Sequence, residues 1–158
     1  DSQSYRLRGF VDRSPEAIEG GHIFFTLQNG KGQIKCAAFE PTKNFRSIVK
    51  QLMPGDELEV WGAVRDKTLN LEKMNILRLA EQGVLVAPTC PQCKRRMESA
   101  GKGQGYRCRR CKTTALGRER RPLIRNLETG FYEVPPCARR HLSKPLVRMS
   151  GENIHHSR

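Results

Sequence analysis

The sequence is poor in apolar and aromatic residues. Hydrophobic residues make up 37% of its 158 positions and aromatic residues 6%, which is little for one well-filled core. It contains no run of about 18 apolar residues, so no membrane-spanning helix is predicted, and no signal peptide is recognisable. We therefore expect a cytoplasmic protein with no membrane partner, built as one ordinary domain or two small ones.

Acidic residues are scarce as well. Asp and Glu number 16 against 29 Lys and Arg, which gives a formal net charge of +13. Such an excess favours polyanions, meaning nucleic acid or an anionic membrane surface. It is unevenly placed, because residues 1–87 carry 12 basic and 11 acidic groups whereas residues 88–158 carry 17 and 5. We infer two modules with different roles.

The first module, residues 1–80, has the period of β-strands interrupted by one short helix. Alternation predicts three strands between residues 4 and 39, the last two joined by an Asn-Gly-Lys-Gly turn. It places Ile23, Phe25 and Leu27 on one face of the second strand, and in the third strand it places Cys36 inward and Ala37 outward. Apolar residues at helical spacing follow over residues 42–52, and then two more strands. In the last strand the apolar phase slips between Leu71 and Met74, which predicts a β-bulge. This order of elements is typical of a five-stranded OB-fold barrel, so the fold class is mainly β.

The face formed by strands 2 and 3 of an OB-fold commonly binds oligonucleotides. Phe24, Lys35 and Phe39 are our candidates on this face, because an aromatic side chain there can stack a base for about 1–3 kcal/mol. Burial of either ring under a loop is the alternative, since Phe is usually buried, and Trp61 has the same ambiguity. The first module is nearly neutral, so most of the phosphate affinity must come from elsewhere.

Residues 81–88 are predicted to be a linker, and residues 89–135 a zinc ribbon with a flanking hairpin. Two Cys-x-x-Cys pairs with 14 residues between them supply four thiolates at the spacing of a tetrahedral Zn²⁺ site. Four thiolates leave no open coordination position, so we predict a structural zinc; redox disulfides or an iron site are less favoured. The lone Cys36 and Cys137 favour a reducing compartment. The predicted ligands are Cys90, Cys93, Cys108 and Cys111.

Basic residues crowd around these cysteines. Some of them would offset the net negative charge of four thiolates around one Zn²⁺. Residues 94–125, however, hold 12 Lys and Arg against two Glu, an excess that suits RNA phosphates. Tyr106 could stack on a base or pack within the ribbon. Our candidates for RNA contact in this region are Lys94, Arg95, Arg96, Lys102, Tyr106, Arg107, Arg109 and Arg110.

Residues 136–158 are predicted to be a basic C-terminal segment, with a helical turn over residues 138–142 and a disordered end. Arg139, Arg140 and Lys144 cluster there as further candidates for RNA contact. Docking on another domain and a solvated surface remain open for them. Because the chain starts at Asp1 rather than at a methionine, we expect it to be a fragment of a longer protein.

Stretches from both modules, taken together, resemble the C-terminal part of the archaeal agmatidine (2-agmatinylcytidine) synthetases, which act on the isoleucine tRNA with a CAU anticodon. The resemblance covers residues 8–148 and is more specific than either fold alone, because several distinctive stretches occur in order. Those stretches are GGHIFFTL, CAAFEPTKNFR, LNLEKMNIL, the MESAGKGQGYRC part of the four-cysteine ribbon, and ARRHLSKPLVR.

The resemblance implies an OB-fold and a zinc ribbon that bind tRNA beside a catalytic domain of the same polypeptide. In that family, agmatine is joined to the wobble cytidine with the use of ATP, so that the tRNA decodes AUA. The family's ATP-binding and phosphoryl-transfer residues have no counterpart here, and the sequence contains neither a Walker-type loop nor an Asp-rich metal cluster. We therefore assign no catalytic residue to this chain, and ATP and agmatine are expected as substrates of the full-length enzyme only.

Two other functions remain open from the sequence. A stand-alone protein that binds single-stranded nucleic acid can combine the same two folds. A zinc ribbon can also dock onto a protein, although the density of Arg would then require a matching acidic surface on the partner.

Overall fold

The computed structural model describes residues 3–149 and 154–155, which divide into two compact units. The first unit contains the described residues of 1–80 and of 125–158, and the second unit is Glu81–Ile124. This division differs from the expected boundaries, because residues 125–135 lie with the barrel and not with the ribbon. Among the described residues, no helix combines the length and the apolar character that crossing a bilayer requires.

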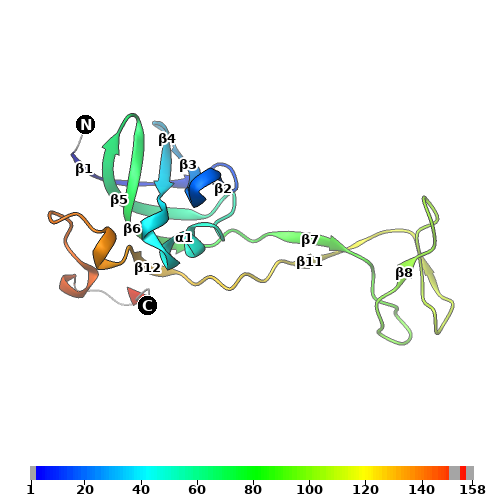
Figure 1. The fold of residues 1–158 in the computed structure, drawn as a ribbon. Helices are drawn as coiled ribbons and strands as arrows, with labels where there is room; N and C mark the ends of the chain where they lie inside the picture. Colours follow the sequence, from blue (N-terminus) through cyan, green and yellow to red (C-terminus); the bar gives the residue numbers. More distant parts are fainter. Residues whose placement is uncertain (1–2, 150–153, 156–158) are drawn as a thin grey trace. The chain divides into compact units, whose positions relative to one another are not determined.

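Five strands of the first unit close into a barrel (Figure 1). Their order is β6-β4-β3-β1-β5, and pairing of β5 with β6 completes the ring. All neighbours are antiparallel except β4 and β6. This pairing confirms the predicted OB-fold. The strands are β1 (Ser4–Val11), β3 (Ile23–Asn29), β4 (Gly32–Ala38), β5 (Glu57–Arg65) and β6 (Thr68–Arg78), and the short β2 (Glu16–Ala17) pairs with β3.

The barrel core follows the alternation of the strands. Ile23, Phe25 and Leu27 are buried on the inner face of β3, as predicted. In β4, Cys36 is buried as expected, but Ala37, which the alternation placed outward, is buried too. The outer face of β4 is therefore also covered at that position.

The predicted bulge in β6 is confirmed. Trp61 pairs with Lys73 and Gly62 pairs with Leu71, so Glu72 has no partner in the ladder between them. At Gly62 a Cβ atom would lie 2.0 Å from the carbonyl oxygen of Asn70. Only glycine allows β5 and β6 to approach so closely beside the bulge.

A short helical segment connects β4 to β5. It consists of η2 (Glu40–Thr42) and α1 (Asn44–Val49), with a kink between them at Lys43, whose φ is 45°. No side chain caps α1, and the Thr42 hydroxyl donates to the Phe39 carbonyl at 2.6 Å. Another short turn, η1 (Glu19–Gly21), precedes β3.

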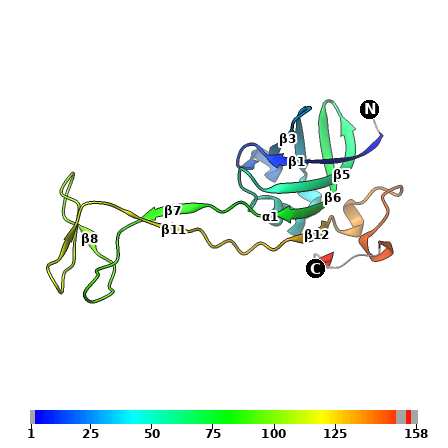
Figure 2. The ribbon, with the colours of Figure 1, turned by 180° about the vertical axis from the view of Figure 1, so that it is seen from behind.

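Residues 125–149, the C-terminal strap, return to the barrel (Figure 2). The strand β12 (Gly130–Glu133) extends the sheet antiparallel to β6, and β13 (Ile154–His155) lies parallel to β12. The helical turns of this segment are η3 (Pro136–Ala138) and η4 (Leu146–Arg148), which flank the predicted turn over residues 138–142. The end of the chain, expected to be disordered, thus contributes one described strand, and its other residues lie outside the described part.

A buried ion pair fastens the start of the strap. The guanidinium of Arg125 donates to both carboxylate oxygens of Asp56 at 2.6 and 2.8 Å, and to the carbonyls of Ala80 at 3.0 Å and Gln51 at 3.3 Å. The side chains of Asp56 and Arg125 are 0% and 9% exposed. Backbone amides of Met53 and Ala80 complete the carboxylate's hydrogen bonds, so this buried pair is fully satisfied.

The second unit begins and ends as a two-stranded ladder. The strand β7 (Gly83–Val86) pairs antiparallel with β11 (Glu119–Pro122), so residues expected to form a linker are β-structure. Between them lies a three-stranded sheet in the order β10-β9-β8. Its strands are β8 (Glu98–Ser99), β9 (Tyr106–Arg107) and β10 (Thr114–Ala115), and the predicted glycine-rich turn joins the first two.

Candidate metal centre and nucleic-acid interface

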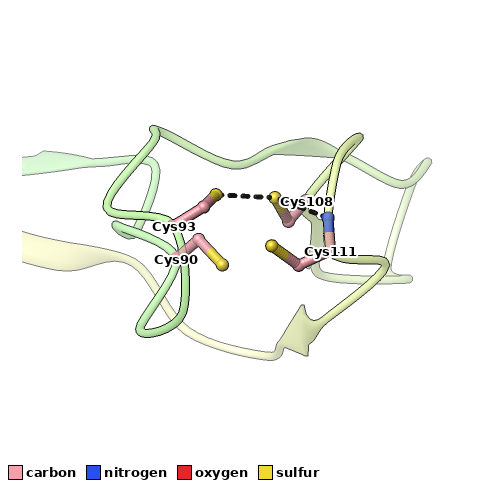
Figure 3. A group of neighbouring side chains, drawn as sticks. All are labelled: Cys90, Cys93, Cys108 and Cys111. Carbon is pink, nitrogen blue, oxygen red and sulfur yellow. Dashed lines mark hydrogen bonds between the residues drawn. The ribbon is translucent and has the colours of Figure 1, made fainter.

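The four predicted zinc ligands converge (Figure 3). The sulfurs of Cys90, Cys93, Cys108 and Cys111 all lie within 4.8 Å of one another, and those of Cys93 and Cys108 are 3.5 Å apart. Zn–S bonds of about 2.3 Å in a tetrahedron place sulfurs roughly 3.8 Å apart. The geometry therefore fits a structural Zn²⁺ with four thiolates, and such a site leaves no coordination position for a substrate.

The two Cys-x-x-Cys turns have the same backbone geometry. In the first, the amide of Lys94 donates to the Cys90 carbonyl at 2.9 Å; in the second, the amide of Lys112 donates to the Cys108 carbonyl at 3.0 Å. Both lysines have positive φ, 59° and 60°. Glycine is the residue favoured in this conformation, so each lysine costs about 1 kcal/mol of backbone strain. The repeated Cys-x-x-Cys-Lys pattern is a sequence signal for this geometry that the sequence analysis did not use.

Hydrogen bonds shift the pKa values of these cysteine thiols in different directions. The backbone amide of Cys93 is the main reason that the pKa of Cys90 falls to about 6. The backbone amide of Cys111 likewise lowers the pKa of Cys108. The pKa of Cys111 instead rises to about 12, mainly through its hydrogen bond with the Cys93 side chain. Four negative charges this close repel one another, so a cation is needed before all four sulfurs can be thiolates.

The apolar core of the ribbon is very small. Its buried residues are Cys90, Met97 and Cys108, with Tyr106 and Ala115 partly buried against them. Three strands of two residues each cannot supply the stability that a fold needs. The metal therefore holds the ribbon together.

The two cysteine turns also bring four arginines around one hollow. It has a volume of about 450 Å³, and its lining includes Arg95 and Arg96 from the first turn and Arg109 and Arg110 from the second. Arg109 donates to Glu98 at 2.6 Å, whereas the other three have no carboxylate partner within the described ranges. The predicted RNA contacts Lys94, Lys102 and Arg107 lie on the same unit, and all three are exposed.

Tyr106 is integrated into the ribbon. Its ring is partly buried against the cysteine cluster, and its hydroxyl accepts a hydrogen bond from Arg118 at 2.9 Å. These contacts favour the packing role over base stacking.

On the barrel, the predicted candidates of β3 and β4 form one cluster. The Lys35 ammonium lies 4.2 Å from the centre of the Phe24 ring, and the Phe24 and Phe39 rings meet edge to face at 6.2 Å. Phe39 is 36% exposed and also contacts His22. Beside them, Phe24 and Lys35 line a cavity of about 180 Å³. A single aromatic and cationic surface is therefore present where an OB-fold commonly binds nucleic acid.

The candidates of the C-terminal strap differ from each other. Arg139 pairs with Glu133 at 2.8 Å, and Arg140 pairs with Glu72, the residue at the bulge. The Arg140 guanidinium thus docks the strap on the barrel, and the Arg139 guanidinium holds the strap to its own strand β12; the sequence analysis considered neither role. The ammonium of Lys144 has no carboxylate partner in the described part of the chain.

Comparison with known proteins gives the same two modules. A model described as an OB-fold nucleic acid binding domain matches residues 5–75, and one described as the TiaS C-terminal zinc ribbon domain matches residues 87–127. The tRNA 2-agmatinylcytidine synthetase TiaS of Archaeoglobus fulgidus is 56% identical over 97% of this chain, and that of Methanosarcina acetivorans is 50% identical over 98%. The chain spans 36% of the length of each of these relatives.

Solved structures agree. The crystal structure of apo TiaS superposes with a TM-score of 0.86 at 55% identity, covering 99% of this chain and 37% of that one. A complex of TiaS with its isoleucine tRNA and ATP gives a TM-score of 0.83 at 54% identity, covering 99% and 36%. Over nearly its whole length, the chain is therefore similar to a region of the tRNA 2-agmatinylcytidine synthetases TiaS that makes up about a third of those proteins and ends in their C-terminal zinc ribbon.

Proposed function

We propose that this chain is the tRNA-binding part of an enzyme that uses ATP to join agmatine to the wobble cytidine of the isoleucine tRNA with a CAU anticodon. The observation that carries the proposal is the match of both modules, over 97% of the chain, to a relative named for this product. Catalysis, ATP and agmatine belong to the remainder of the enzyme, which acts in the cytoplasm. The zinc in this region is structural.

In this proposal, the two units contact different parts of the RNA. The ribbon holds phosphates through its exposed cations, because bidentate guanidiniums suit phosphate oxygens. The barrel offers Phe24 and Phe39, with Lys35 beside them, to bases exposed in a loop. A wobble base lies in such a loop. The ribbon cations assigned to RNA are Lys94, Arg95, Arg96, Lys102, Arg107, Arg109 and Arg110.

A salt series tests the proposal directly. We expect the zinc-loaded chain to bind a transcript of this tRNA with an affinity that falls steeply as salt rises, because released counterions drive phosphate binding. The double variant Arg95→Glu, Arg96→Glu should weaken binding more than tenfold, whereas Lys50→Glu on the barrel, an exposed lysine outside both surfaces, should have little effect. Filter binding measures both. No binding, or an affinity insensitive to salt, would contradict the proposal.

Two further outcomes point to the alternatives. Single-stranded DNA of equal length that competes as well as the tRNA would favour a general single-strand-binding protein. RNA binding that survives the charge reversal, with loss only of association with the catalytic part, would indicate that the ribbon docks onto protein.

A further inference from the structure

A cavity on the barrel lies on other strands than the Phe24 cluster. It has a volume of about 220 Å³ and is lined by β1, β5, β6 and the C-terminal strap. Three of its side chains are cationic, and its one carboxylate, Glu72, is already paired with Arg140. The polar lining residues are Ser4, Tyr5, Arg6, Glu72, Lys73, Ser143 and Lys144, together with Trp61.

Trp61 holds one of these cations in place. The guanidinium carbon of Arg6 lies 5.4 Å from the centre of the indole, and Phe131 packs against the same ring at 5.8 Å. Arg6 also donates from Nε to Glu59 at 2.6 Å, while its side chain remains 66% exposed. A guanidinium fixed on an aromatic face in this way keeps its outer N–H groups available for an oxyanion.

The other two cationic residues of the cavity, Lys73 and Lys144, are joined by a hydrogen bond to the main chain. Lys73 is buried and donates from Nζ to the Lys144 carbonyl at 2.6 Å. Burial is the main reason that the pKa of Lys73 is lowered; the carboxylates of Glu133 and Glu72 oppose this shift, and the charges of Arg139 and Lys144 add smaller lowering effects. Lys73 is thus engaged within the protein, and the ammonium of Lys144, which has no carboxylate partner among the described residues, is the lysine of this cavity that remains available for an anion.

We propose that this cavity binds a phosphate group through Arg6 and Lys144, and that the group is a phosphodiester of the RNA backbone. The hydroxyls of Ser4 and Ser143 line the same cavity and supply neutral donors. The source of the phosphate rests on the proposed function, since the RNA there is tRNA. The contact adds a third RNA surface to those on the ribbon and on β3–β4.

Trp61 is the only tryptophan in the chain, so its fluorescence reports on this cavity alone. The zinc-loaded chain is titrated separately with the tRNA transcript, ATP and inorganic phosphate. We expect tRNA to change the emission saturably at the concentrations at which it binds. The Lys144→Ala variant, which keeps the backbone carbonyl that Lys73 uses, should weaken tRNA binding about tenfold and reduce the salt slope by about one.

Two variants control for fold and charge. Lys50→Ala removes an exposed charge outside the cavity and should leave both readouts unchanged. Arg6→Lys keeps the charge but loses the planar fork, so it should weaken the fluorescence response while the protein stays folded. tRNA that binds to the ribbon without changing Trp61 emission, and with wild-type affinity for Lys144→Ala, overturns this inference and leaves the proposed function intact. A response to ATP or phosphate but none to tRNA assigns the cavity to a free nucleotide or ion and overturns the RNA source.

Discussion

The barrel and the ribbon are stabilised by different means. The barrel has a continuous apolar core that includes Phe45, Leu58 and Met74, and its strap is fastened by ion pairs. The ribbon has three buried apolar or cysteine side chains and depends on its metal site. One unit is therefore sensitive to loss of core contacts, and the other to loss of zinc.

The two units also use their positive charge differently. In the strap, Arg125, Arg139 and Arg140 each pair with a carboxylate of the barrel unit. In the ribbon, Arg95, Arg96 and Arg110 have no such partner among described residues. Both segments are rich in basic residues, but the strap arginines serve mainly to hold their own unit together, whereas most of the ribbon arginines have no such structural role.

Removing the zinc should give the largest loss of stability, and that loss should be confined to the ribbon. Structural zinc contributes on the order of 10 kcal/mol to the folding of small metal domains. We expect EDTA to collapse the amide NMR dispersion of residues 89–115 while Trp61 fluorescence and the barrel's thermal transition persist. Simultaneous loss of both signals would show that the barrel depends on the ribbon.

The buried pair should carry the next largest effect, confined to the barrel unit. Arg125→Ala leaves the fully buried Asp56 carboxylate without its counter-charge, which costs about 3–5 kcal/mol. The matched control is Arg8→Ala, whose pair with Glu57 has the arginine 64% exposed and should cost at most about 1 kcal/mol. Urea denaturation followed by Trp61 fluorescence measures both. Equal losses would mean that burial of the pair is unimportant.

Arginine variants in the ribbon and in the strap should change different properties, namely tRNA affinity in the ribbon and folding stability in the strap. Arg95→Ala combined with Arg96→Ala should lower the salt slope of tRNA binding by about two without changing the melting temperature. Arg139→Ala should leave Glu133 short of a partner and cost about 1–3 kcal/mol, with tRNA binding kept. The pattern fails if Arg139→Ala weakens binding in a still-folded protein, because that arginine would then contact RNA.

The smallest effect concerns the two strained lysines. Lys94→Gly combined with Lys112→Gly should relieve backbone strain and stabilise the ribbon by about 1 kcal/mol per site, while removing two charges near the RNA surface. Chelator competition for zinc and the tRNA salt slope measure the two effects. Lys102→Gly is the control, since Lys102 is not among the residues with positive φ; it should lose charge with no gain in zinc affinity.

Local patterns in the sequence predicted the parts of the fold that depend on neighbouring residues. The period of two predicted the barrel strands, and the phase slip between Leu71 and Met74 predicted the bulge at Glu72. The cysteine spacing predicted which four sulfurs converge. In each case the physical cause lies within a few residues of the signal.

The parts of the fold that could not be predicted depend on contacts between residues that are far apart in the sequence. Arg140 and Glu72 are 68 residues apart in sequence, and Arg125 and Asp56 are 69 apart. Periodicity carries no information about such partners, so residues 136–158 were expected to be a basic segment that contacts RNA, docks on another domain or is solvated. The β7–β11 ladder was missed for the same reason, because each strand is too short and too mixed in composition to indicate its partner.

The contact of Arg125 with the Ala80 carbonyl has a consequence for the ancestry and engineering of the chain. These two residues bracket the whole second unit, and just inside them the amide of Leu123 donates to the Gln82 carbonyl at 2.8 Å, so the entering and leaving chains lie side by side. Inserted modules are best tolerated where the two ends of the host chain already meet. The ribbon is thus an insertion within the barrel unit and not an addition at its end. A short glycine linker from residue 80 to residue 125 should replace the ribbon without changing the connectivity of the barrel strands.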